Sequence, residues 1–347
     1  MGHETLLGVL IGGGEPGARL GARVEGFMAT QVIATVARLG VPDRLAEGPR
    51  SAAELAAGTG ADAGALARLL RSAVAYGVLT QDEHGCFGLT TEGELLRSDV
   101  DGSARDFILG FTGPPFWNAL GRLEDVVLSG QAAAAPGPRL WAELARRPED
   151  ARRFARGMGA STARLVAELP RAYDPSGFER IVDVGGGQGT LLSGLLAGAP
   201  RATGVLFDLP EQLAEAPAVL AAAGVADRTE TVAGSFLEAV PAGGDLYVLS
   251  GVLHNWGDDT GCAILANVHE AARPGSTLLV IEVLLPPGPG PSRVHLVDLM
   301  MLAATNGRQR TREEHEAQLT AAGYELVRDV ALDHLVEPWH ILEARRV

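Results

Sequence analysis

The 347-residue chain contains no lysine and only two cysteines, Cys86 and Cys262, and it has no long apolar run. All 29 basic residues are arginine, against 43 acidic ones, and the net charge of −14 disfavours nucleic acid and anionic membranes as partners. Two cysteines are too few for a disulfide framework or a structural zinc site. No segment reaches the roughly 20 apolar residues of a membrane span, and the first residues do not resemble a signal peptide. We therefore expect a cytoplasmic protein that uses no metal.

The length is about twice that of a typical domain of roughly 150 residues, which predicts two domains. A change in pattern near residue 170, from helical to alternating strand and helix, supports this division. We expect an N-terminal domain over 1–102, connecting helices over 103–169, and a second domain over 170–347.

The N-terminal region has the element order of a winged helix. A helical pattern begins at Leu20, Ser51 and Glu54 have the spacing of a capping box, and a further helix over 62–76 precedes a short hairpin over 78–89. That last helix carries only two arginines, whereas DNA readers present a basic stripe. The pattern favours a packing or dimerisation module over a DNA-binding one.

From residue 180 onward, buried-strand patterns alternate with helical ones, which predicts a mostly parallel sheet covered on both faces. The last two strands, over 324–330 and 340–344, have no helix between them. The fold class is therefore α/β, with a Rossmann-like sheet that ends in an antiparallel hairpin.

A glycine loop follows the first strand of this region. Asp183 precedes Gly185-Gly186-Gly187-Gln188-Gly189, and glycine is required where a ligand lies against bare backbone. The dinucleotide pattern G-x-G-x-x-G fails, because Thr190 stands where its last glycine belongs. Asp208 ends the second strand about 20 residues later, where an acid binds ribose hydroxyls. The alternative is that Asp208 only caps the following helix.

Another motif follows the strand over 245–249. His254 comes just past the carboxyl edge of the predicted sheet, where open α/β folds bind ligands, so a role as a base is favoured over a structural one. We expect Trp256 to pack, and Asp258 and Asp259 to cap a helix that begins near residue 260.

Together these motifs resemble the class I S-adenosylmethionine-dependent O-methyltransferases of the two-domain type, which include plant phenolic and actinobacterial natural-product enzymes. The resemblance covers nearly the whole chain. It implies a winged-helix dimerisation domain, a homodimer, S-adenosylmethionine as methyl donor, S-adenosylhomocysteine as product, and no metal.

The resemblance also implies roles for individual residues. Ser235 and Ser250 replace residues that often contact the cofactor in the family, an acid and, in plant members, a lysine. The implied cofactor-binding residues are Asp183, Gly185, Gly187, Gly189, Asp208, Leu209, Gly234, Ser235, Phe236 and Ser250.

His254 matches the family's general base and Glu282 the acid that orients it. Gln309 stands where a second glutamate is common, and a neutral amide does not stabilise an imidazolium by charge. Phe154 and Met158 match a Phe-x-x-x-Met pair that lines the acceptor site, although ordinary core packing would explain them equally well. The implied acceptor-site residues are Phe154, Met158, Trp117, Asn255, Asp298 and Met301.

We therefore expect an enzyme that methylates a phenolic hydroxyl of an aromatic natural product. Two alternatives stay open. The same fold could methylate nitrogen or carbon, or hydroxylate or decarboxylate a similar substrate, and a winged-helix regulator could sense an adenosyl ligand. The identity of the acceptor is not encoded in these motifs.

Overall fold

The computed structural model describes residues 15–132, 138–332 and 339–347. The chain forms two compact units, of which the first ends at Gly113 and the second begins at Pro114. No helix of the described residues is both long enough and apolar enough to cross a bilayer.

The first unit consists of helices and one two-stranded hairpin. The predicted capping box is confirmed, because the Ser51 and Glu54 side chains each bond the other's backbone N–H, and Asp62 caps the next helix. A core that includes Leu55, Leu70 and Phe87 lies between these elements. In chain order they are α2 (Pro16–Arg38), α3 (Val41–Arg44), α4 (Ala52–Thr59), α5 (Ala63–Ala75), β1 (Leu79–Gln81), β2 (Phe87–Leu89), α6 (Thr91–Glu94) and α7 (Arg105–Phe111).

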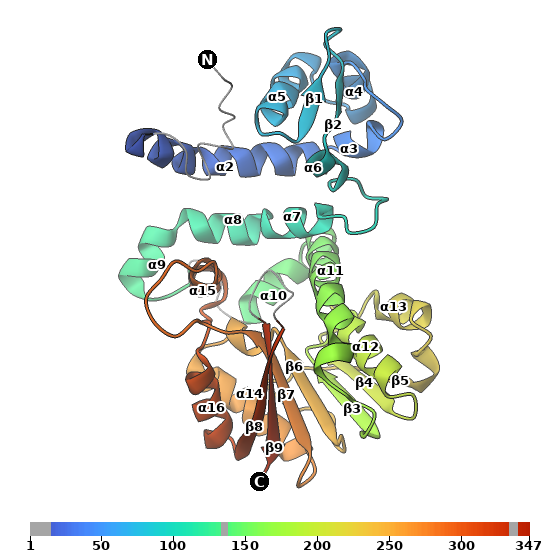
Figure 1. Ribbon diagram of the computed structural model, residues 1–347, viewed down its shortest axis with the longest axis vertical. Helices are drawn as coiled ribbons and strands as arrows, with labels where there is room; N and C mark the ends of the chain where they lie inside the picture. Colours follow the sequence, from blue (N-terminus) through green and yellow to red (C-terminus); the bar gives the residue numbers. More distant parts are fainter. Residues whose placement is uncertain (1–14, 133–137, 333–338) are drawn as a thin grey trace. The chain divides into compact units, whose positions relative to one another are not determined.

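The second unit is built on a seven-stranded sheet in the order β5-β4-β3-β6-β7-β9-β8 (Figure 1). Strands β3 to β7 are parallel, and β9 runs antiparallel to both β7 and β8. The predicted parallel sheet with a terminal antiparallel hairpin is thereby confirmed. The strands are β3 (Arg180–Val184), β4 (Thr203–Asp208), β5 (Thr229–Ala233), β6 (Leu246–Ser250), β7 (Thr277–Val283), β8 (Tyr324–Leu332) and β9 (Trp339–Arg346).

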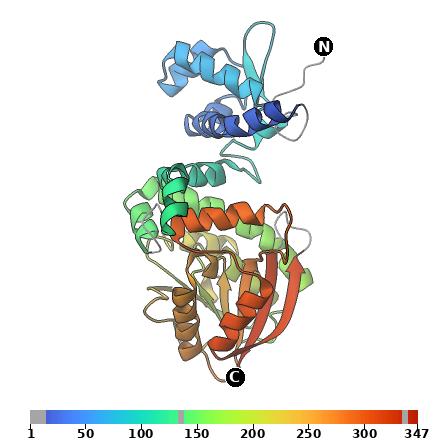
Figure 2. The same ribbon diagram turned by 90° about the vertical axis from the view of Figure 1, so that its left-hand side faces the viewer.

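Helices cover both faces of this sheet (Figures 1 and 2). On one face, α11, α12 and α13 enclose a core with Ile181, Val248 and Leu279, and on the other, α14 and α16 enclose a core with Leu249 and Val280. The helices are α8 (Pro114–Gly121), α9 (Leu123–Ser129), α10 (Pro138–Ala145), α11 (Pro148–Ala172), α12 (Thr190–Gly198), α13 (Ala216–Ala222), α14 (Asp258–Ala271), α15 (Val294–Thr305) and α16 (Arg312–Ala321), with short 3-10 turns η1 (Ala226–Arg228) and η2 (Leu253–Asn255).

Two expectations about helix caps are corrected. Helix α14 begins at Asp258 rather than near residue 260, its N-cap is Gly257, and no side chain caps it. The Asp258 carboxylate binds the buried guanidinium of Arg310 instead. An unpaired buried charge costs more free energy than an uncapped helix end. The alternative of a helix cap at Asp208 is also wrong, since α13 begins only at Ala216.

Candidate active site

The glycine loop lies at the carboxyl edge of the sheet, between β3 and α12. Gly185, Gly187 and Gly189 all have positive φ, of 74°, 56° and 83°. A Cβ on Gly186 would lie 2.5 Å from the Asp183 carboxylate, so this carboxylate lies directly beneath the loop. A Cβ on Gly187 would meet no atom within 4 Å, which leaves open space on the other side of the backbone.

Two buried carboxylates support this loop. Asp208 accepts hydrogen bonds from the backbone N–H of Gly187 (2.8 Å) and of Leu209 (2.7 Å). Burial raises the pKa of Asp208 to about 6, although these two hydrogen bonds oppose the shift. Burial, together with the nearby charge of Asp208, raises the pKa of Asp183 to about 7. Among the described residues, Asp183 Oδ2 has no hydrogen-bond partner.

This arrangement fits S-adenosylmethionine. The backbone of the loop is bare, and each Asp208 oxygen that accepts one hydrogen bond keeps a second lone pair for a ribose hydroxyl. Phe236 lies beside the loop, since a Cβ on Gly185 would lie 3.4 Å from its ring, and the same ring packs edge-on against Trp256 at 5.9 Å. Trp256 thus packs as expected, and Phe236 is placed to flank a flat base.

The histidine lies at the same edge, on the 3-10 turn that follows β6. His254 Nδ1 is 3.3 Å from Glu282 Oε2 and 3.0 Å from Gln309 Nε2. Glu282, on β7, is completely buried, whereas the His254 side chain is 16% exposed. Burial raises the pKa of Glu282, and the neighbouring His254 and Arg310 oppose that shift. Both contacts use Nδ1, so Nε2 is the ring nitrogen left to meet a ligand.

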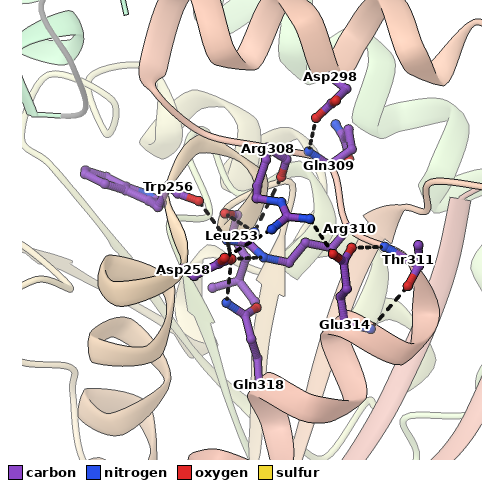
Figure 3. A network of polar contacts seen from close by, with 10 residues as sticks. All are labelled: Leu253, Trp256, Asp258, Asp298, Arg308, Gln309, Arg310, Thr311, Glu314 and Gln318. Atoms are coloured by element: carbon purple, nitrogen blue, oxygen red, sulfur yellow. Dashed lines mark hydrogen bonds and ion pairs between the residues drawn. The ribbon is translucent and has the colours of Figure 1, made fainter. Parts of the chain in front are cut away.

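The segment after α15 holds the histidine from the other side. The Arg308 N–H donates to the His254 carbonyl at 3.0 Å, and a Cβ on Gly307 would lie only 2.1 Å from that oxygen. Asp298 accepts a hydrogen bond from the Gln309 N–H at 2.7 Å, which fixes the backbone of the residue that contacts the imidazole (Figure 3). Position 307 must be glycine for the chain to pass this close to the His254 carbonyl.

The two contacts of His254 Nδ1 impose opposite requirements on its proton. An amide N–H of Gln309 needs an acceptor, whereas a carboxylate of Glu282 needs a donor. Among the described residues, neither Glu282 Oε2 nor Gln309 Oε1 has a hydrogen-bond partner. If the amide turns by 180° about its last bond, Nδ1–H faces two oxygens and Nε2 becomes an acceptor. This is the tautomer that a base requires.

Aromatic side chains gather near the start of α11. The ring of Phe154 stacks on that of Phe116 at 5.5 Å and lies 5.8 Å from that of Trp141. Met158 follows Phe154 by one helical turn, and Trp117 and Met301 lie on α8 and α15, which pack against each other. Methionine and aromatic side chains are suited to contact a flat apolar ligand.

The remaining predicted residues stabilise or border the same edge through local contacts. Asn255 donates to the Gly251 carbonyl at 3.0 Å, which stabilises the turn, and Ser250 is the last residue of β6. Ser235 accepts from the N–H of Leu237 at 3.3 Å. Gly234 passes so close to Phe207 that a Cβ would lie 2.6 Å from its ring.

Sequence reasoning missed several residues at this edge. Arg310 is buried beside the histidine, and the sequence does not predict this burial. Nothing in the local sequence Gly307-Arg308-Gln309-Arg310-Thr311 distinguishes a buried arginine from an exposed one. Gln188 bonds Glu215 at 3.0 Å, and Glu215 pairs with Arg156 of α11 at 3.2 Å. Spacing in the sequence gives no signal for this chain of contacts.

Comparison with known proteins identifies the family of the chain. Residues 120–325 match the model of the O-methyltransferase domain, and residues 23–99 match the O-methyltransferase dimerisation domain. The chain is 37% identical to phenazine O-methyltransferase of Lysobacter antibioticus, over 88% of this chain and 90% of that protein. It is also 37% identical to 3-amino-4-hydroxybenzoate 4-O-methyltransferase of Streptomyces cremeus, over 89% and 86%.

Other similar proteins extend the range of chemistry. Phenazine-1-carboxylate N-methyltransferase of Pseudomonas aeruginosa is 34% identical, over 89% of this chain and 92% of that protein. The structure of mitomycin 7-O-methyltransferase has a TM-score of 0.87 and 32% identity, covering 95% of this chain and 97% of that one. An O-methyltransferase from neocarzinostatin biosynthesis, solved with S-adenosylmethionine and a naphthoic acid, has a TM-score of 0.77 and 31% identity, covering 92% and 96%.

A glycine loop, two buried carboxylates and a histidine lie at one edge of the parallel sheet. The chain belongs to the O-methyltransferase family whose domain and dimerisation models it matches. It is an S-adenosylmethionine-dependent methyltransferase. Within the described residues, no group of three or more His, Cys, Asp or Glu side chains is arranged to hold a metal ion.

Proposed function

We propose that the protein methylates a phenolic hydroxyl of an aromatic natural product, with His254 as general base. The observation that carries this proposal is the contact of His254 Nδ1 with the fully buried Glu282 at 3.3 Å, at the sheet edge that holds the glycine loop. A carboxylate on Nδ1 favours the tautomer whose Nε2 accepts a proton. The relatives that act on hydroxybenzoate and phenazine substrates support an aromatic acceptor.

The cofactor is assigned to the residues of the loop and its neighbours. Bound S-adenosylmethionine supplies an electrophilic methyl group. Asp208 would hold the ribose, the backbone of 185–189 the methionine part, and Gly234, Ser235 and Phe236 the adenine. Asp183, Leu209 and Ser250 complete the set that frames this space.

The chain's own contribution to the reaction is to position the acceptor and to remove its proton. An unperturbed phenol has a pKa near 10, as tyrosine does, and therefore keeps its proton at neutral pH. Nε2 of His254 takes this proton as the oxygen acquires its new bond, and Glu282 stabilises the imidazolium that results. Gln309 presents its amide oxygen to Nδ1–H and so orients the ring without adding charge. Phe154, Met158, Trp117, Asn255, Asp298 and Met301 are the proposed acceptor-site residues.

N-methylation is the second candidate. The similarity to an N-methyltransferase favours it, and so does the neutral Gln309 where an acid would stabilise an imidazolium, because an amine acceptor places less demand on the base. Hydroxylation, decarboxylation and a regulatory role have no comparable observation in their favour.

A homodimer formed through the N-terminal unit is proposed from one exposed apolar face. Leu20, Val24, Phe27 and Met28 recur on one side of α2 and are between 43% and 64% exposed. Such a face is typical of a subunit interface, and the match to a dimerisation domain supports this. The division into 1–102, 103–169 and 170–347 and a cytoplasmic location also stay proposals.

One acceptor tests both candidate reactions, because 3-amino-4-hydroxybenzoate carries an amine and a hydroxyl on neighbouring carbons. Incubation with S-adenosylmethionine, followed by mass spectrometry and NMR of the product, shows which atom is methylated, and a panel of phenols and phenazines extends the search. We expect His254→Ala to lower kcat about 10²–10⁴-fold. Calorimetry should show unchanged cofactor affinity in this variant and loss of affinity in Asp208→Ala. Full activity of His254→Ala would disprove the role as base.

A further inference from the structure

Arg310 lies fully buried behind the histidine turn, with a relative exposure of 1%. Its Nε and Nη2 donate to Asp258 Oδ1 at 3.0 and 2.8 Å. Its Nη1 donates to the Leu253 carbonyl at 3.0 Å and its Nη2 to the Trp256 carbonyl at 2.9 Å (Figure 3). One guanidinium therefore joins a carboxylate to the backbone on both sides of His254.

The turn needs such support because it is short. A single 3-10 turn, Leu253–Asn255, carries the imidazole, and the Trp256 N–H closes this turn on the Leu253 carbonyl at 3.1 Å. Arg310 adds a second donor to the Leu253 carbonyl and satisfies the Trp256 carbonyl, and the backbone N–H of Arg308 satisfies the carbonyl of His254 itself at 3.0 Å. The position of the ring thus depends on contacts from the segment 307–310.

Several charged and polar groups face this guanidinium. Asp258 comes from the start of α14, Glu282 from β7, Arg308 from the same segment as Arg310, and His315 and Gln318 from α16. Burial and the neighbouring Arg310 lower the pKa of His315 to about 3, so this imidazole stays neutral and adds no charge. Asp258 and Glu282 are the anions that balance Arg310.

We propose that Arg310, with Asp258 as its counter-ion, is a positioning residue that holds the His254 imidazole against Glu282 in the geometry required for proton transfer. This rests on the proposed role of His254 as base. A lysine would not replace it, because an ammonium lacks the planar fork that reaches a carboxylate and two carbonyls at fixed angles.

Arg310 has a second, electrostatic effect on the same pair. Its positive charge opposes the burial that raises the pKa of Glu282, and so favours the ionised carboxylate. Without that charge, Glu282 would take up a proton at higher pH and would no longer accept the Nδ1 hydrogen of His254. Geometry and charge are therefore separable, since Arg310→Lys keeps the charge and loses the fork, whereas Arg310→Met loses both.

The test compares Arg310→Lys, Arg310→Met and Asp258→Asn with Arg312→Met, whose surface guanidinium pairs with Glu316 at 2.7 Å and serves as the control. Measured quantities are kcat and KM with 3-amino-4-hydroxybenzoate or the best acceptor of the panel, cofactor Kd by calorimetry, Tm, and the pH dependence of kcat. We expect kcat to fall 10- to 100-fold in both Arg310 variants, with cofactor Kd within twofold of the control. The acidic limb should move to higher pH in Arg310→Met only.

A kcat and a pH profile within twofold of the Arg312→Met control would overturn the proposal. So would a loss of kcat that is accompanied by an equal loss of cofactor affinity and the same pH profile in both Arg310 variants, because this would indicate a structural role only. If Arg310→Met does not fold, Arg310→Lys and Asp258→Asn decide through kcat and KM.

A second readout does not depend on turnover. The rate at which diethyl pyrocarbonate modifies His254, followed by mass spectrometry, should rise at least threefold in the Arg310 variants and remain unchanged in the control. An unchanged rate would contradict the positioning role, whatever the enzyme methylates. Failure of the proposed base would show instead as an active His254→Ala variant, so the two failures are distinguishable.

Discussion

The glycine loop and the histidine turn lie at the same edge of one sheet, but they are built in different ways. The loop is a run of five residues between β3 and α12, and the two acids beneath it lie at the ends of the neighbouring strands β3 and β4. The histidine cluster combines residues 254, 282, 309 and 310 from different elements. The proposed cofactor site therefore depends mainly on short segments at the ends of neighbouring strands, whereas the proposed catalytic site depends on tertiary contacts between distant segments.

The two regions also differ in charge. The acids beneath the loop, Asp183 and Asp208, have raised pKa values because both are buried, and the charge of Asp208 adds to the shift of Asp183. Glu282 is equally buried, but His254 and Arg310 oppose the rise of its pKa. The first pair therefore favours the protonated form more than free carboxyl groups do, whereas at Glu282 the neighbouring His254 and Arg310 partly offset the effect of burial.

Two glycine substitutions should break one region at a time, and they have the largest expected effects. In Gly186→Ala the new methyl would lie 2.5 Å from the Asp183 carboxylate, so the loop must move and cofactor affinity should fall at least about 100-fold. In Gly307→Ala it would lie 2.1 Å from the His254 carbonyl, so kcat should fall by at least about 100-fold while cofactor Kd changes little. Calorimetry and steady-state kinetics measure the two quantities.

Gly257→Ala is the control for this pair, because its methyl would meet only the Asn306 carbonyl at 3.7 Å, an ordinary contact. It should match the wild type in both measurements. Equal loss of cofactor affinity in Gly186→Ala and Gly307→Ala would show that the two regions are not independent.

The same contrast explains what the sequence could predict. Alternating strand and helix patterns predicted the strands β3 to β7, their parallel sheet and the terminal hairpin. Asp183, the loop and Asp208 are candidates that the sequence offers because they lie at the ends of consecutive strands, and their roles stay predictions. The motif around His254 and the match of Glu282 to a known pattern placed both residues at the site.

The rest depends on contacts that sequence spacing does not encode. The sequence predicts a helix cap at Asp258, since an acid before an apolar helical pattern is typical of one. In the structure its carboxylate instead accepts a hydrogen bond from the buried Arg310. The tilted contact between the rings of Trp141 and Phe154 joins α10 to α11 and has no signature in the local sequence. The local sequence does not distinguish a buried arginine from an exposed one, because burial is determined by tertiary packing.

The pH dependence of cofactor binding sharpens the comparison further. Asp208 must be ionised to accept hydrogen bonds at both oxygens, and its pKa is raised to about 6. Protonation below that pH removes an acceptor, so affinity should weaken as pH falls, by about tenfold between pH 7 and pH 5. Titration of S-adenosylmethionine by calorimetry across this range measures the effect.

In His254→Ala the cofactor affinity should depend on pH as it does in the wild type, because the acid responsible, Asp208, lies beneath the glycine loop. Asp208→Asn should bind weakly at every pH, with a much flatter profile. If wild-type affinity does not change between pH 5 and 7, Asp208 does not bind the ribose as a carboxylate.

Asp183→Asn should have the smallest effect, on stability rather than on binding. The folded pKa of about 7 lies above the unfolded value near 4, so between these two pH values the folded protein holds a proton that the unfolded chain has released. This contribution to the free energy of unfolding is present at low pH and is lost as pH rises toward 7, at up to about 1.4 kcal/mol per pH unit. Asparagine copies the neutral acid and removes this loss.

Thermal unfolding of the protein without cofactor should therefore give similar Tm values for wild type and Asp183→Asn at pH 4, and a Tm a few degrees higher for the variant at pH 8. A variant that is less stable at both pH values would mean that the charged form of Asp183 supports the loop through a contact that the folded chain makes only with the carboxylate. A higher Tm at pH 8 would instead show that this buried acid destabilises the protein before the cofactor binds, whereas at Glu282 the neighbouring Arg310 and His254 partly offset the same cost.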